Sequence, residues 1–238
     1  MYSCRTCNMK NSCFFFPILL AVACVAHAED AFLKDCLDRL DDANSKVKSI
    51  VAELAFETVT MGQKQVVEGS LRYLNADKEY ASTELRQPGM KVLAVQRGDS
   101  LYNRFGNTAW TATKIEPGSG GMNPILQLAA YFRKESLTFQ EEKNGVRIYS
   151  ATISKGGEQV KVRLSINASN RRLESIQTLG DSGETVTISE FYYSAIQGVD
   201  FPYKTAIRTV GEAPISSSQE YRNITLNASL PKSWFVPN

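Results

Sequence analysis

Apolar and polar side chains alternate along almost the whole chain from residue 51 to residue 226. The clearest run is EQVKVRLSIN, where Val160, Val162, Leu164 and Ile166 are separated by polar residues. A period of two predicts strands with one buried face and one solvated face. About ten or eleven such runs succeed one another with no stretch of linker composition between them. The pattern predicts a single, mainly β domain whose large sheet must curl to protect its edges.

Two segments break this alternation and predict helices. From residue 30 to residue 49, apolar residues recur at steps of three and four and form one stripe, which predicts an amphipathic helix. Its members are Leu33, Cys36, Leu37, Leu40, Ala43, Val47 and Ile50. A glycine-rich loop, EPGSGGMNP, precedes a second, short helix in ILQLAAYFRK, with Asn123 as cap and Pro124 in the first turn.

The first 28 residues have the pattern of a secretory signal peptide. Arg5 and Lys10 precede the apolar run FFFPILLAVACVA, and Ala28 closes a small-residue cleavage site. A run of about 13 residues is too short for a permanent membrane helix. We therefore expect a signal peptide at 1–28, a single domain at 29–238 and a periplasmic location. The alternative is a lipoprotein that is anchored through Cys24 in LAVAC.

Removal of this leader changes the charge and the cysteine count. It carries two of the 27 basic residues and none of the 25 acidic ones, so the remaining chain is neutral. No basic run is present, and we expect no contact with nucleic acid. Four of the five cysteines, including the Cys4–Cys7 pair, also lie in the leader. Only Cys36 remains, as a buried apolar residue without a disulfide partner.

Histidine chemistry is excluded, because the only histidine, His27, belongs to the leader. This removes His-dependent triads, Cys–His pairs and His-ligated metals. Among the carboxylates, Glu53 and Glu57 alternate with apolar residues and are interpreted as a solvated strand face; a carboxylate-dependent hydrolase stays a minor alternative. The glycines near residue 120 lack the Lys-Ser/Thr pair of a phosphate loop. We expect no enzyme activity, no cofactor and no metal.

A curled sheet with an apolar inner face and two helical pieces can enclose either an ordinary core or an apolar cavity. An acyl chain suits such a cavity, because each buried methylene contributes about 0.8 kcal/mol without any reactive group. Plain core packing is the alternative for each lining residue. The candidate lining residues are Leu54, Phe56, Leu71, Tyr73, Trp110, Leu126, Leu128, Val162 and Leu164.

Several short motifs carry a family resemblance. Gly69, Leu71 and Tyr73 in VVEGSLRYLNADKEYASTEL fit a Gly-x-Leu-x-aromatic pattern followed by a turn and a second strand. SLYNRF follows the turn at Gly98, and GVDFPYKTAIRT precedes YRNITLNASLPKSWFVPN near the end. With the exported amphipathic helix, this order resembles the LolA-type outer-membrane lipoprotein-sorting proteins. Ala76, where the family often has proline, and the RGD turn depart from the family pattern.

The resemblance implies a half-open antiparallel β-barrel of about eleven strands, closed by a helical lid. It implies a periplasmic carrier of the acyl chains of lipoproteins or lipids, with an inner-membrane exporter and an outer-membrane acceptor as partners. Arg72 would correspond to the family's lid-contacting arginine. We expect a monomer. The alternative is a binding or sensor module of the same fold that recognises a membrane regulatory protein or a lipoprotein.

Overall fold

The computed structural model describes residues 30–87, 89–115, 129, 132–133, 135–155, 158–211 and 214–237. The chain forms two compact units, Met1–Asp35 and Cys36–Asn238. The predicted signal peptide, Leu126 and Leu128 lie outside the described residues, as does most of the predicted second helix. Among the described residues, no helix is long and apolar enough to cross a membrane.

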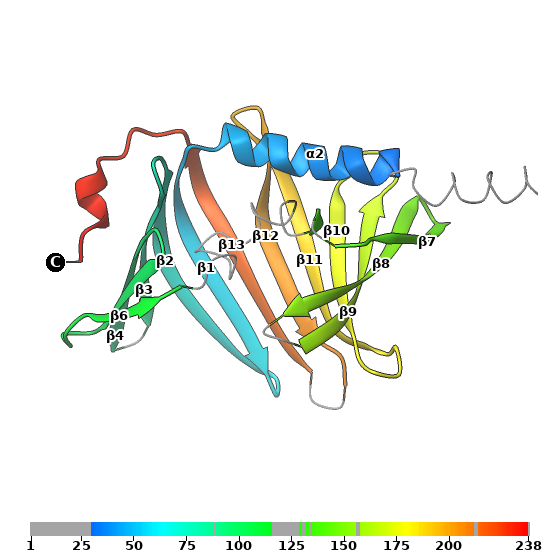
Figure 1. The fold of residues 1–238 in the computed structure, drawn as a ribbon. Coiled ribbons are helices and arrows are strands. Elements are labelled where there is room, and N and C mark those ends of the chain that lie inside the picture. The colour runs from blue at the N-terminus through cyan, green and yellow to red at the C-terminus, as the bar shows by residue number, and fades with distance from the viewer. Residues whose placement is uncertain are drawn as a thin grey trace, which may run out of the picture. The chain divides into compact units, whose positions relative to one another are not determined.

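The second unit is built on one antiparallel sheet of thirteen strands (Figure 1). Their order is β6-β5-β4-β3-β2-β1-β13-β12-β11-β10-β9-β8-β7, and the described strands β6 and β7 are the two edges. The sheet is therefore an open half-barrel. The strands are β1 (Ser49–Thr60), β2 (Gln63–Asn75), β3 (Glu79–Gln87), β4 (Met90–Arg97), β5 (Ser100–Phe105), β6 (Thr111–Lys114), β7 (Thr138–Lys143), β8 (Val146–Lys155), β9 (Glu158–Asn167), β10 (Leu173–Leu179), β11 (Thr185–Ile196), β12 (Val199–Thr209) and β13 (Ile215–Leu226).

The predicted fold class is confirmed, but the strand count of about eleven was low. Every side chain of β6 and β7 is exposed. An edge strand without a buried face carries no apolar alternation, and for this reason period-two analysis did not detect β7.

Tight turns connect neighbouring strands as their sequences require. Asn144 and Gly145 have φ values of 53° and 75°, and Gln197 and Gly198 have 49° and 77°. Two consecutive residues with positive φ form the two-residue hairpin turn that matches the twist of the flanking strands. Pro202 follows the second turn and lies at a bulge opposite Tyr193. The pairing of β12 with β13 begins only at Lys204, so the missing N–H of Pro202 costs no hydrogen bond between these two strands.

Helix α2 (Ala31–Lys46) precedes the sheet. The Asp30 carboxylate caps it by accepting hydrogen bonds from the backbone N–H groups of Phe32, at 2.9 Å, and Leu33, at 3.4 Å. The helix is shorter than predicted, because Ile50 already belongs to β1.

The Cys36–Lys46 part of α2 covers one end of the sheet's inner face (Figure 1). Ala43 packs there in one cluster with Leu54, Leu71 and Tyr73 of the strands. This part of the helix also buries Cys36 and Leu37. Burial of a leucine side chain contributes roughly 1.5–3 kcal/mol, so apolar area holds the helix on the sheet.

A second, smaller cluster lies on the outer face. The 3₁₀ helix η2 (Lys232–Phe235) places Phe235 against Tyr80 of β3 and Val95 of β4. The rings of Phe235 and Tyr80 have centroids 5.7 Å apart. Lys232 forms an ion pair of 2.7 Å with Asp77 in the β2–β3 turn. The C-terminal segment is therefore fastened to the sheet from outside.

Candidate functional site

An apolar cavity of about 180 Å³ opens on the inner face of β1 to β4 and β13. Alternation brings its lining residues to this face, because Leu85 pairs with Val92 and Thr83 with Ala94 across β3 and β4. Among the residues that the structure describes, the lining consists of Leu54, Phe56, Leu71, Thr83, Leu85, Val92, Ala94 and Gln219. Only two of them are polar, and the Gln219 amide donates a hydrogen bond of 2.7 Å to the Tyr221 hydroxyl. The cavity is suited to hydrocarbon.

Gly69 explains where the cavity lies. It faces Leu54 on one side and Leu85 on the other, so the middle strand contributes no side chain between them. A Cβ at this position would stand 2.1 Å from the Glu84 carbonyl oxygen and 2.8 Å from Leu85 Cδ2. The Gly-x-Leu-x-aromatic motif thus combines a close approach of β2 and β3 with two inward side chains, Leu71 and Tyr73.

The structure brings part of the predicted lining set together. Leu54, Phe56 and Leu71 line the cavity. Tyr73 lies in the same core cluster, and its hydroxyl donates to the Glu79 carboxylate at 3.1 Å. Burial and the adjacent Glu79 charge raise the pKa of the Tyr73 phenol.

Other predicted residues lie elsewhere. Val162 and Leu164 are buried on β9, which contributes no residue to this cavity. Trp110 packs against the cluster of Tyr80, Val95 and Phe235 on the outer face. Trp110 was predicted to face inward, but the face of an aromatic residue beside a four-residue edge strand has no periodic signal.

Arg72 also lies on the outer face of β2, because it alternates with the inward Leu71 and Tyr73. Its guanidinium stands over the Trp234 ring, 5.0 Å from the centroid. In the structure Arg72 therefore contacts the C-terminal segment, on the face of the sheet opposite to α2.

Sequence reasoning missed five residues of the lining: Thr83, Leu85, Val92, Ala94 and Gln219. Four of them, Thr83, Leu85, Val92 and Ala94, lie in the alternating segments YASTEL and KVLAV. Alternation alone does not tell which of the two faces of a short strand is the inner one, so these four residues were not predicted.

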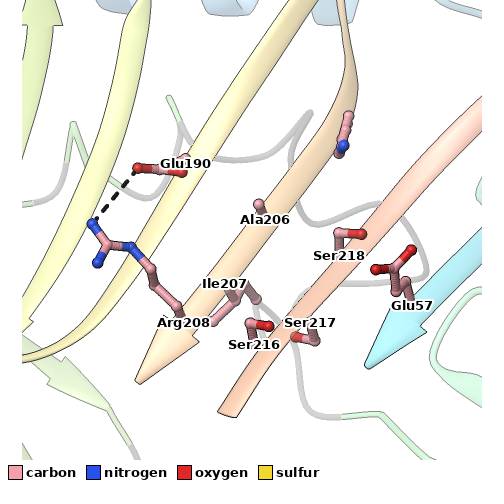
Figure 2. Close-up of a pocket in the computed structure, with 9 residues that line it drawn as sticks. Glu57, Glu190, Ala206, Ile207, Arg208, Ser216, Ser217 and Ser218 are labelled. Atoms are coloured by element: carbon pink, nitrogen blue, oxygen red, sulfur yellow. Dashed lines mark ion pairs between the residues drawn. The ribbon is translucent and has the colours of Figure 1, made fainter. Parts of the chain in front are cut away.

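A second hollow of about 160 Å³ lies across the outer face of β1, β13, β12 and β11 (Figure 2). Its floor is made of small side chains, since Ala206 pairs with Ser218. Figure 2 shows Glu57 at one side and the Glu190–Arg208 ion pair, at 4.0 Å, at the other. Exposed pairs of this kind contribute at most about 1 kcal/mol.

Each of the two carboxylates considered for hydrolysis has its own polar partner. Glu57 binds Lys64 at 2.7 Å, and Glu53 accepts a hydrogen bond from Asn223 at 2.8 Å. The two carboxylates are thus engaged by different partners on different neighbouring strands, Lys64 on β2 and Asn223 on β13. Within the described part of the chain, no group of His, Cys, Asp and Glu side chains could hold a metal ion.

The sequence and the structure were compared with those of known proteins. No family model matches the sequence, and no curated protein matches it. A DUF1329 family protein from Desulfovibrio piger superposes with a TM-score of 0.62 at 12% identity, over 86% of this chain and 97% of that one. A LolA superfamily protein from Nitrosomonas europaea superposes with a TM-score of 0.59 at 16% identity, over the same shares. The chain has a LolA-like fold.

A third crystal structure with the LolA-like fold is a domain from Vibrio parahaemolyticus described as a putative outer membrane lipoprotein-sorting protein. It has a TM-score of 0.58 and 11% identity, over 85% of this chain and 97% of that one. The likeness at these identities concerns the fold, which confirms the fold predicted from the sequence resemblance.

Proposed function

We propose that this protein is a periplasmic carrier that binds the acyl chains of lipoproteins or lipids and moves them between membranes without catalysis. The observation that carries the proposal is the apolar cavity on the inner face of an open sheet with a LolA-like fold. The predicted signal peptide supports export. An inner-membrane exporter and an outer-membrane acceptor are the partners that a shuttle of this kind requires.

The size and chemistry of the cavity support an acyl chain. A volume of about 180 Å³ accommodates on the order of six groups of the size of a water molecule. Burial of each methylene contributes about 0.8 kcal/mol, so one chain segment of this length supplies several kcal/mol. Longer chains would extend along the inner face.

The test combines lipid analysis with a variant that fills the cavity. Protein purified without detergent is extracted, and the extract is analysed by mass spectrometry for bound lipid. In parallel, Ala94→Phe is expected to weaken the binding of fluorescent cis-parinaric acid about tenfold, because its ring occupies the space of two or more methylenes. Ala206→Phe, in the outer hollow, is the matched control and should bind as the wild type does.

Absence of extracted lipid together with absence of parinaric acid binding would contradict the carrier. The alternative function is a binding or sensor module for a membrane regulatory protein, and the outer hollow with its charged margins is the surface that favours it. In that case Ala206→Phe, and not Ala94→Phe, would be the variant that changes activity in cells.

A further inference from the structure

A glutamine side chain interrupts the apolar lining of the inner-face cavity. The lining holds two polar residues, Thr83 and Gln219. Thr83 is only 5% exposed, whereas Gln219 on β13 is partly exposed. Gln219 lies opposite Phe56 across the pair of β1 and β13, so its amide adjoins the apolar wall. An amide in apolar surroundings costs free energy unless its hydrogen bonds are made, and apolar packing alone does not explain a glutamine here.

The buried ring of Tyr221 fixes the orientation of this amide. Tyr221 follows two residues later on the same face of β13 and is 2% exposed. Its hydroxyl accepts a hydrogen bond of 2.7 Å from Gln219 Nε2. The Tyr221 ring packs edge-on against Phe201, with centroids 5.9 Å apart. Because the ring is held in the core, the amide is oriented before a ligand binds and loses little conformational entropy on binding.

Part of the hydrogen-bonding capacity of Gln219 is available to a ligand. A primary amide carries two N–H donors and one carbonyl acceptor. One N–H binds Tyr221, and in the part of the chain that the structure describes the second N–H and the Oε1 atom have no partner. A single donor at the wall of an apolar cavity matches a ligand that carries one acceptor next to a hydrocarbon part.

The charge of the cavity indicates which acceptor fits. No charged side chain belongs to the described lining. An ionised carboxylate would lose its hydration there without a cationic partner, which is costly. An uncharged carbonyl oxygen needs only a donor of the kind that Gln219 offers. Acyl chains that are joined to a larger molecule through an ester or an amide carry such a carbonyl at the end of the hydrocarbon.

We propose that Gln219 Nε2 donates a hydrogen bond to the carbonyl oxygen of an ester-linked or amide-linked acyl chain, with Tyr221 as a positioning residue. The inference deepens the proposed function and rests on it for the acyl nature of the ligand. It assigns to the cavity acylated molecules in preference to plain hydrocarbons and fatty acid anions.

The test is calorimetric titration of delipidated, detergent-free protein with three uncharged octyl-chain probes. These probes are methyl octanoate, N-methyloctanamide and methyl octyl ether, of which only the ether lacks a carbonyl. Gln219→Leu should weaken the binding of the two carbonyl probes about threefold to tenfold, because a hydrogen bond is lost. Binding of the ether should stay within about twofold of the wild type, since leucine keeps the wall apolar and of similar volume.

Tyr221→Phe tests the positioning role. The substitution removes the acceptor that holds the amide but keeps the ring. It should weaken the binding of the carbonyl probes by about twofold to threefold and leave the ether unchanged, since only one hydrogen bond is loosened. A merely structural role would weaken the binding of all three probes alike.

Thr205→Val is the matched control. Thr205 pairs with Gln219 across β12 and β13, but its hydroxyl oxygen is buried and out of reach of a ligand in the cavity. This variant should therefore bind all three probes as the wild type does. Circular dichroism and the thermal midpoint establish that the three variants are folded.

Equal losses for the ether and the carbonyl probes in Gln219→Leu, or no loss for any probe, would overturn the carbonyl contact and leave the acyl carrier intact. A loss of carbonyl binding in Thr205→Val as large as that in Gln219→Leu would overturn the assignment to Gln219. A loss confined to the ester or to the amide would support the contact and identify the linkage. Failure of all three probes to bind the wild type would contradict the carrier itself.

Discussion

Gly69 on β2 approaches Glu84 on β3 so closely that a Cβ on the glycine would stand 2.1 Å from the Glu84 carbonyl oxygen. The contact is with backbone, which cannot rotate away as a side chain could. The close approach of β2 and β3 at this point therefore requires a residue without a side chain at position 69.

Replacement of this glycine tests the contact directly. Gly69→Ala should lower the free energy of unfolding by about 2–4 kcal/mol, since the added methyl group forces β2 and β3 apart. Urea denaturation followed by circular dichroism measures the change. Ser70→Ala, the neighbouring substitution, should stay within about 0.5 kcal/mol of the wild type. Equal stability of Gly69→Ala and wild type would mean that the strands are not in this register.

The C-terminal segment offers a second prediction. Phe235 is fully buried on the outer face, whereas Trp234 is 50% exposed. Phe235→Ala should cost about 3–5 kcal/mol through the cavity it leaves beside Tyr80. Trp234→Ala removes mainly the contact with Arg72 and should cost about 0.5–1 kcal/mol. Thermal unfolding of the two variants should rank them in this order, and the reverse order would contradict the packing of η2.

We predict that the buried phenol of Tyr221 makes the protein less stable at alkaline pH. Burial raises the pKa of its phenol from 10.0 to about 12. Below pH 10 the phenol is protonated in the folded and unfolded states, so its contribution is complete. Between pH 10 and about 12 the unfolded phenol ionises first, so stability falls as pH rises, by up to about 2–3 kcal/mol. Urea midpoints across this range should fall less steeply in Tyr221→Phe, and identical slopes would refute the assignment.

Cys36 can report the opening of α2. Its side chain is 1% exposed, so a thiol reagent should label the native protein slowly. Arg133 binds Asp38 and Asp41 of the helix at 2.5 Å and 2.7 Å. Arg133→Gln should therefore speed labelling by about twofold to fivefold, as expected for the loss of exposed ion pairs.

The labelling experiment needs protein in which the four cysteines before residue 25 are serine, so that Cys36 is the only thiol. Arg147→Gln, which breaks the pair with Glu142 at 2.7 Å, is the matched control. Equal acceleration by both substitutions would indicate general destabilisation and not release of α2.

Period-two alternation predicted much of the sheet because it records which side of a strand is buried. Val162 and Leu164 are buried, with relative exposures of 2% and 1%, as their alternation requires. The edge strand β6 adjoins an alternating run that was predicted as strand, whereas β7 escaped detection because both of its faces are exposed to solvent.

The site was predicted only in part for a related reason. Leu54 and Leu71 were found because they lie on long strands, whereas Ala94 looks like any small residue until β3 and β4 are paired. Arg72 was assigned through the resemblance alone. Its position on the outer face follows from its place between Leu71 and Tyr73, which alternation could have supplied.

The pairing of β1 with β13 has a consequence for how the newly synthesised chain folds. Ile50 faces Leu226 across this pair, so the centre of the sheet joins the earliest strand to the last one. Until β13 emerges, β1 exposes a row of unpaired backbone groups that can capture foreign strands. Contacts of such long range also form slowly. Strand β13 must therefore be synthesised before the sheet can close at its middle, and until then the unpaired edge of β1 is exposed to aggregation.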